Sequence, residues 1–199
     1  MVVHLGLGLS TGTIKGSVKP ASARTEARDS DKWFEAAALS GQTTRKRTGL
    51  ESAVAYGPYK AQGEYFMIDY RPSGGASQGI NAYYGELLWN ITGESHNYSN
   101  TANTFGWIKP SKAFTGKGGL GAWQVGLRYS NFDATDFTSL TAGTTNKANA
   151  TTVGLTWFVN DNVRFMLNYV DTSFGSAVGS GAAARTGEKA VLMRGQVSF

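Results

Sequence analysis

The sequence predicts an all-β protein: an antiparallel transmembrane β-barrel, or a section of one, with about eight strands. Apolar and polar residues alternate in segments of roughly nine or ten residues, the length that a tilted strand needs to cross a bilayer. Short turns alternate with long connections rich in Gly, Ser, Thr, Asn and Ala. Aromatic side chains gather near the ends of the predicted strands, as they do in the girdles of membrane barrels.

The composition fits this class. The chain has 199 residues, of which 26 are glycine and 4 proline, and 41% are hydrophobic. We treat residues 1–199 as a single domain. No apolar run approaches the ~18 residues of a transmembrane helix. Low overall hydrophobicity does not exclude a membrane protein, because alternating strands average to neutral hydropathy.

Other classes of function find little support. The absence of cysteine excludes disulfides and thiolate metal sites. The net charge of +5 is mild and does not indicate a nucleic-acid partner. The two histidines, His4 and His96, have no plausible nucleophile beside them, and there is no phosphate-binding glycine loop. We therefore expect no enzyme activity, catalytic residue, metal or cofactor.

Four strands are predicted in the first half of the chain. Val3, Leu5 and Leu7 alternate with polar or glycine residues in the first. Residues 50–56 and 59–68 follow as a hairpin across the tight turn Gly57-Pro58, and residues 83–91 form the fourth strand.

Four more strands are predicted in the second half. They are residues 123–129, residues 153–157, residues 163–169 after a turn at 160–162, and residues 191–199. Alternation predicts that one outward face carries Trp123, Leu155, Phe165 and Val197.

The connections predict an orientation. Long connections at 11–48, 133–149 and 173–187 fall outside the cell if the last strand descends to the periplasm. The two short turns then fall at the periplasmic rim. Residues 92–120 also fall there although they are long, and we expect them to pack into the lumen or against the rim.

The aromatic residues of the apolar faces form a predicted membrane-interface girdle. A sandwich core also collects aromatics, but the opposite faces here carry charges and amides that a dry core excludes. The girdle residues are Tyr56, Tyr59, Tyr65, Trp89, Trp123, Tyr129, Trp157 and Tyr169.

Alternation directs charged residues of the strands inward. Arginine suits an anion path because it stays charged and offers several donors in a planar fork. The alternative is that these residues, with Glu51, pair across neighbouring strands and brace the wall. The predicted pore-lining residues are Arg128, Arg164, Arg194, Lys60, Glu64 and Glu86.

The long connection 11–48 ends in the basic triplet Arg45, Lys46 and Arg47. Two interpretations stay open. The connection dips into the pore and forms a constriction with this triplet, or it is a solvated outer loop, since charge runs are usually solvated.

Several segments in order resemble the phosphate-selective porin O and P family of Gram-negative outer membranes. They are Ala53-Val54-Ala55-Tyr56-Gly57-Pro58-Tyr59-Lys60-Ala61-Gln62-Gly63-Glu64-Tyr65, then Ile91-Thr92-Gly93-Glu94, and Gly121-Ala122-Trp123-Gln124-Val125-Gly126-Leu127-Arg128-Tyr129-Ser130. Residues 154–169 look like the penultimate hairpin of the family. Together these segments cover most of residues 49–199.

The resemblance implies an outer-membrane porin, a homotrimer of barrels with about sixteen strands each, that conducts small anions such as phosphate. This chain would hold half of such a barrel. The first residues lack the features of a signal peptide, so we expect an N-terminally truncated sequence. The implied partners are outer-membrane lipid and the assembly machinery, which we expect to read Phe199 as a C-terminal signal.

Two alternatives remain at this point. One is a small closed barrel with a structural or adhesive role, its interior filled by side chains. The other is a soluble β-sandwich or lipocalin-like binding protein. Detergent dependence separates the soluble protein from the barrels, and conductance in planar bilayers separates a porin from a closed barrel.

Overall fold

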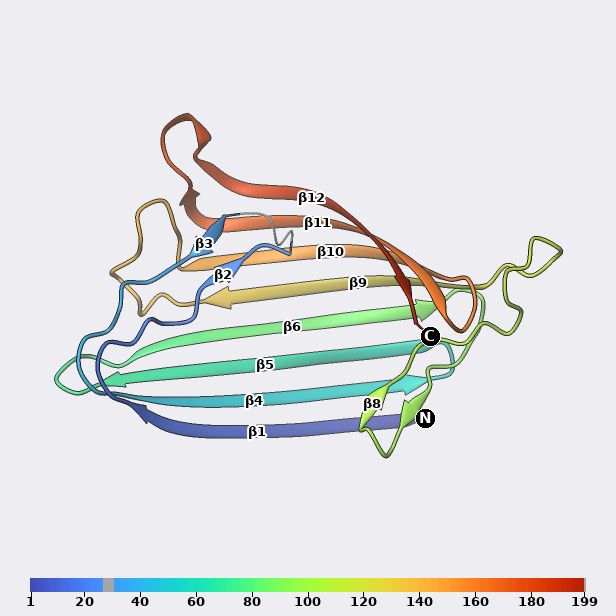
Figure 1. Ribbon diagram of the computed structural model, residues 1–199, viewed down its shortest axis with the longest axis horizontal. Coiled ribbons are helices and arrows are strands. Elements are labelled where there is room, and N and C mark those ends of the chain that lie inside the picture. Colours follow the sequence, from blue (N-terminus) through green and yellow to red (C-terminus); the bar gives the residue numbers. More distant parts are fainter. Residues whose placement is uncertain (27–30, 199) are drawn as a thin grey trace.

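The computed structural model describes residues 1–26 and 31–198. Eight long strands lie side by side in one antiparallel sheet, in the order β1-β4-β5-β6-β9-β10-β11-β12 (Figure 1). They are β1 (Val2–Ile14), β4 (Thr43–Tyr56), β5 (Tyr59–Pro72), β6 (Gln78–Asn90), β9 (Ala122–Asp133), β10 (Lys147–Phe158), β11 (Val163–Val178) and β12 (Arg185–Val197). The prediction of an all-β antiparallel fold with about eight strands is confirmed.

Smaller elements lie in the connections. They are the two-stranded ribbons β2 (Ala23–Arg24) with β3 (Lys32–Phe34) and β7 (Tyr98–Ser99) with β8 (Thr104–Phe105), and the 3₁₀ turn η1 (Gly181–Ala183). Within the described ranges no second large sheet packs on the first, so the sandwich alternative does not fit. In the same ranges β1 and β12 are the two edges and do not pair, so the sheet is not a closed small barrel. No helix of the described residues is long and apolar enough to cross a membrane.

The strand register separates the side chains into two faces. Trp123 lies opposite Trp157, which lies opposite Phe165, so the three share a face. Leu155 is two positions from Trp157, and Val197 pairs with Val163, two positions from Phe165. All four predicted outward residues therefore lie on one side of the sheet, as predicted. We call this the outer face and the opposite side the inner face.

The two ends of the sheet carry different connections. The turn from β4 to β5 needs only Gly57 and Pro58, and Gly57 takes a left-handed φ of 53° that favours glycine. This turn, residues 159–162 and residues 91–121 lie at the turn end, beside both termini (Figure 1). The opposite, loop end holds residues 15–42, 134–146 and 179–184. It also holds the five-residue connection 73–77, so short and long connections are less strictly separated than predicted.

The strands are longer at the loop end than the sequence indicated. The ladder between β1 and β4 continues to the pair Ile14 and Thr43, so the first long connection is 15–42 and not 11–48. Likewise, the other two long connections shrink to 134–146 and 179–184. The hydrophobic alternation stops where the strands leave the apolar band, but the backbone hydrogen bonds of the ladder continue beyond it.

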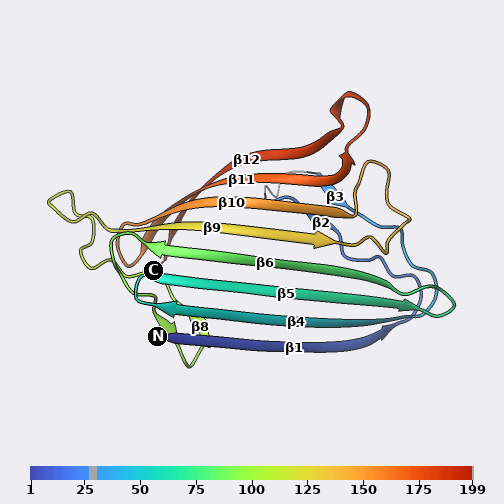
Figure 2. The same cartoon turned by 180° about the vertical axis from the view of Figure 1, so that it is seen from behind.

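A hydrophobic cluster lies on the inner face near the loop end. Residues 15–26 and 31–42 fold back over the sheet there, and both views place β2 and β3 beside the sheet (Figures 1 and 2). Trp33 and Phe34 are 6% and 0% exposed and pack with strand residues that include Tyr70, Ile80 and Phe174. The main hydrophobic core of the described chain therefore lies between this connection and the inner face of the sheet.

Candidate functional site: the inner face of the sheet

The outer face is apolar and aromatic. The register places all eight predicted girdle residues on it. Near the turn end, Trp123 and Trp157 stack at 5.3 Å between ring centroids, and Tyr59 stacks on Trp89 at 6.2 Å. Tyr129 lies six positions along β9 from Trp123, about 20 Å at the rise of a strand. Exposed Leu127 and other aliphatic residues fill the band between these rings. This face fits the hydrocarbon core of a bilayer with an aromatic girdle at each rim.

The inner face carries the six predicted pore-lining residues. Gln62, Glu86, Arg128 and Thr152 form one cross-strand row, so Arg128 and Glu86 point inward. The same parity holds for the remaining predicted residues, which are Lys60, Glu64, Arg164 and Arg194. Their shared face agrees with the prediction, and their role in lining a pore stays a prediction.

The middle of the inner face is a polar network across β5, β6 and β9. Gln62 Nε2 donates to Glu86 Oε1 at 3.0 Å, and Arg128 Nη1 lies 3.9 Å from Glu86 Oε2. The Arg128 guanidinium lies 3.7 Å from the centre of the Tyr84 ring. Tyr84 Oη donates to Glu64 Oε1 at 2.5 Å. These carboxylates therefore engage neighbouring strands, as the wall-bracing interpretation proposed.

Arg164 and Arg194 have different surroundings. Arg164 donates to Gln196 Oε1 at 2.9 Å and stacks 4.1 Å from the ring centre of Trp107. Neither arginine forms an ion pair within the described ranges, and Arg194 is exposed. Two cationic side chains of the inner face thus have no carboxylate paired with them.

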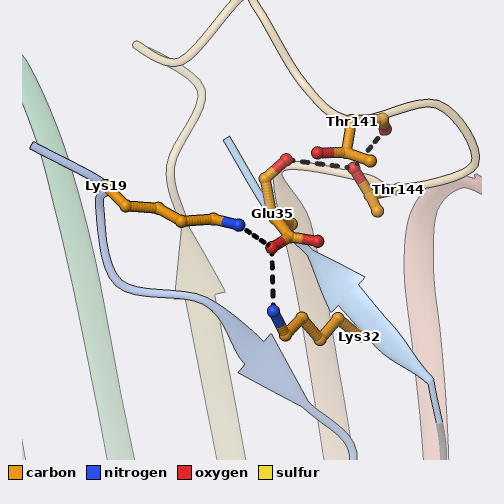
Figure 3. A network of polar contacts seen from close by, with 5 residues as sticks. All are labelled: Lys19, Lys32, Glu35, Thr141 and Thr144. Atoms are coloured by element: carbon orange, nitrogen blue, oxygen red, sulfur yellow. Dashed lines mark hydrogen bonds and ion pairs between the residues drawn. The ribbon is translucent and has the colours of Figure 1, made fainter. Parts of the chain in front are cut away.

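The segment 15–42 is fixed to the loop end by polar contacts. Glu35 Oε1 accepts from Lys19 Nζ at 2.6 Å and from Lys32 Nζ at 2.8 Å (Figure 3). The hydrogen bonds from these two lysines lower the pKa of Glu35 to about 2. The Glu35 carbonyl accepts from the backbone N–H of Thr141 at 2.8 Å. The described parts of this connection therefore pack on the inner face of the sheet, and its role in a pore constriction stays a prediction.

The segment also reaches β10 and β12. Thr25 Oγ1 donates to Glu188 Oε1 at 2.7 Å, and Thr152 Oγ1 donates to Glu26 Oε2 at 3.2 Å. Sequence reasoning missed these contacts and the anchors Trp33 and Phe34. The adjacent aromatic pair inside an otherwise polar segment was the available signal.

The basic triplet does not lie in a loop. Arg45, Lys46 and Arg47 belong to β4, because the ladder with β1 already begins at Thr43. Alternation sends Arg45 and Arg47 to the inner face and Lys46 to the outer face. The predicted loop location is therefore wrong, and the proposed role of the triplet in a constriction stays a prediction.

The long segment at the turn end also packs inward. Phe105 lies under Lys60, whose Nζ is 4.7 Å from the ring centre. His4 Nδ1 lies 2.7 Å from Tyr98 Oη, and Ile108 is 3% exposed beside Phe158. These contacts agree with the expected inward packing for the first part of residues 92–120. The later part differs, because Phe114 packs on Trp157 of the outer face at 5.1 Å between ring centroids. Phe199, the predicted assembly signal, lies outside the described residues.

A single antiparallel sheet that is apolar and aromatic outside, and charged and covered by a loop inside, defines the wall of an outer-membrane β-barrel. The chain belongs to the phosphate-selective porin O and P family, which it matches over residues 6–199. It is accordingly a protein of the bacterial outer membrane.

Two relatives extend this assignment. The chain is 35% identical to "Porin O" of Pseudomonas aeruginosa over 129 residues, which cover 61% of this chain and 28% of that protein. It is 31% identical to an uncharacterized protein of Caulobacter vibrioides over 121 residues, 61% of this chain and 23% of that protein. The chain spans about a quarter of the length of these curated relatives.

Proposed function

We propose that this protein forms part of a water-filled outer-membrane channel for the passive diffusion of small anions such as phosphate. The name of the family supports phosphate as the anion. The charge balance of the inner face carries the proposal. Each strand carboxylate of this face accepts a hydrogen bond or forms an ion pair. These carboxylates are Glu51, Glu64, Glu86 and Glu188.

The cations of the same face are less compensated. Within the described part of the chain, five strand cations of the inner face have no ion pair: Arg45, Arg47, Lys60, Arg164 and Arg194. Unpaired positive charge along a water-filled lumen raises the local concentration of anions and repels cations. An inward-facing arginine is also energetically favoured, since one on the lipid side near mid-membrane costs about 2–4 kcal/mol.

The family also supports proposals about assembly. We include a homotrimer of complete barrels, in which this chain acts as one domain of the wall, and handling by the outer-membrane assembly machinery. Passive diffusion needs only a water-filled channel and fixed charges along its wall, so the proposal includes no enzyme chemistry.

The test is the zero-current potential of the protein, purified from outer membranes and reconstituted in planar bilayers, under a salt gradient. Replacing Arg128, Arg164 and Arg194 together with glutamine is expected to shift this potential toward cation preference. The matched control removes three cations from the outer face, in Arg71→Gln, Lys147→Gln and Lys189→Gln, and is expected to leave the potential in place. An unmoved potential in the inner variant, or equal shifts in both, contradicts the proposal.

A further inference from the structure

One side chain breaks the pattern of the inner face. Among the described strand residues, Phe66 on β5 is the one large, exposed hydrophobic side chain that points inward, and it is 49% exposed. The other exposed large hydrophobic residues of the eight long strands face outward. An aromatic ring that stays exposed to water forgoes the favourable free energy that it would gain if an apolar group covered it.

A cavity lies beside Phe66, between the wall and the segment 15–42. Its volume is about 450 Å³, within the usual range for sites that bind small molecules. Trp33 and Phe132 line it together with Phe66, and Tyr84 and Arg128 contribute from β6 and β9. The cavity thus joins an apolar, aromatic wall to a fixed cation.

The charges of this cavity are mixed. Arg128 lines the cavity and its side chain is 36% exposed, so its guanidinium keeps accessible N–H groups to donate to a ligand. Glu64, which also lines the cavity, uses Oε1 to accept from Tyr84. Glu26 and Arg24 add one further charge of each sign. A simple anion would meet two carboxylates, and a simple cation would meet two guanidinium groups.

We infer that this cavity binds a small zwitterion with an aromatic side group, of the size of an aromatic amino acid. Its ring lies against Phe66, its carboxylate accepts from Arg128, and its ammonium group pairs with Glu64. Charged hydrogen bonds of this kind gain strength beside apolar walls that exclude water. This binding site goes beyond the proposed anion channel, and its test by current block rests on that channel.

Current block in planar bilayers, with the protein purified from outer membranes, tests the inference by three probes. L-phenylalanine is expected to reduce the current at a concentration about tenfold lower than L-alanine, which lacks the ring. 3-Phenylpropionate, which lacks the ammonium group, is expected to be weaker than L-phenylalanine. Equal block by alanine shows that the ring is not recognised, and equal or stronger block by phenylpropionate shows that the zwitterion is not recognised. Either result overturns the inference.

Two variants locate the site. Phe66→Ala is expected to raise the half-blocking concentration of L-phenylalanine about tenfold. Tyr65→Ala removes a neighbouring ring on the outer face, away from the cavity, and is expected to leave the block unchanged. An unchanged block in Phe66→Ala, or equal losses in both variants, overturns the location. The comparison of probes needs no variant, so it decides the chemistry even if a variant fails to assemble. Because block is measured separately from zero-current potential, failure here leaves the anion channel standing.

Discussion

Replacing Phe34 with alanine is expected to release the segment 15–42 from the inner face. Phe34 is fully buried, and its ring centroid lies 5.0 Å from that of Phe132 and 5.8 Å from that of Phe137. Removing a buried phenyl ring from a packed cluster costs about 3–5 kcal/mol. The hydrogen bond of Thr25 to the Glu188 carboxylate contributes about 1.5–3 kcal/mol, less than the packing lost with the ring.

The assay is single-channel conductance in planar bilayers, together with protease cleavage within residues 15–42. The barrel wall stays intact because Phe34 lies outside its eight strands. We therefore expect larger conductance and faster cleavage in Phe34→Ala. Phe165→Ala removes the same ring from the outer face, where Phe165 is 47% exposed, and is expected to change neither. Unchanged conductance and unchanged cleavage in Phe34→Ala would refute the proposed anchoring.

Three further predictions concern the membrane, pH and assembly. Leu127→Arg places a charge within the apolar band of the outer face at a cost of about 2–4 kcal/mol, so less folded protein should reach the membrane. Gln124→Arg on the inner face should assemble normally. Heat-dependent gel migration measures the folded fraction of both variants. The pKa of Glu35 lies at about 2, below its ordinary 4.5, so its ion pairs stabilise the docked segment above pH 4.5 and are lost as the pH falls toward 2. Protease cleavage of the segment should therefore rise over that interval in the natural protein and stay flat in Glu35→Gln. Deleting Phe199 should lower the assembled protein far more than total synthesis, and unchanged assembly in the complete barrel would count against a signal role.

The membrane-spanning part of the fold was predictable because lipid imposes a simple rule on alternate residues. Trp123, Leu155 and Phe165 could be assigned to one face from period-2 spacing alone. The strand ends at the loop end were not predictable in the same way. Arg45 and Arg47 lie in a ladder outside the apolar band, where backbone hydrogen bonds hold the strand and the side chains carry no hydrophobic pattern.

For the inner face, the alternation along each strand predicted which side chains point inward but not which of them touch. Spacing placed Glu86 and Arg128 inward, but their contact depends on the register between β6 and β9, which the sequence does not state. The docking of Trp33 and Phe34 depends on tertiary packing against residues such as Tyr70 and Phe174, distant in the chain. A segment without periodicity gives no local sign of the surface that it will cover.

The opposite environments of the two faces are the central claim, and cysteine labelling along β9 tests it most directly. The natural sequence has no cysteine, so each introduced thiol is the only one in the chain. Single cysteines at positions 124 to 129 are treated with a charged, water-soluble thiol reagent in intact outer membranes. The account predicts that positions 124, 126 and 128 react and that positions 125, 127 and 129 are protected by lipid. Equal reactivity at even and odd positions, or the reverse pattern, would contradict it.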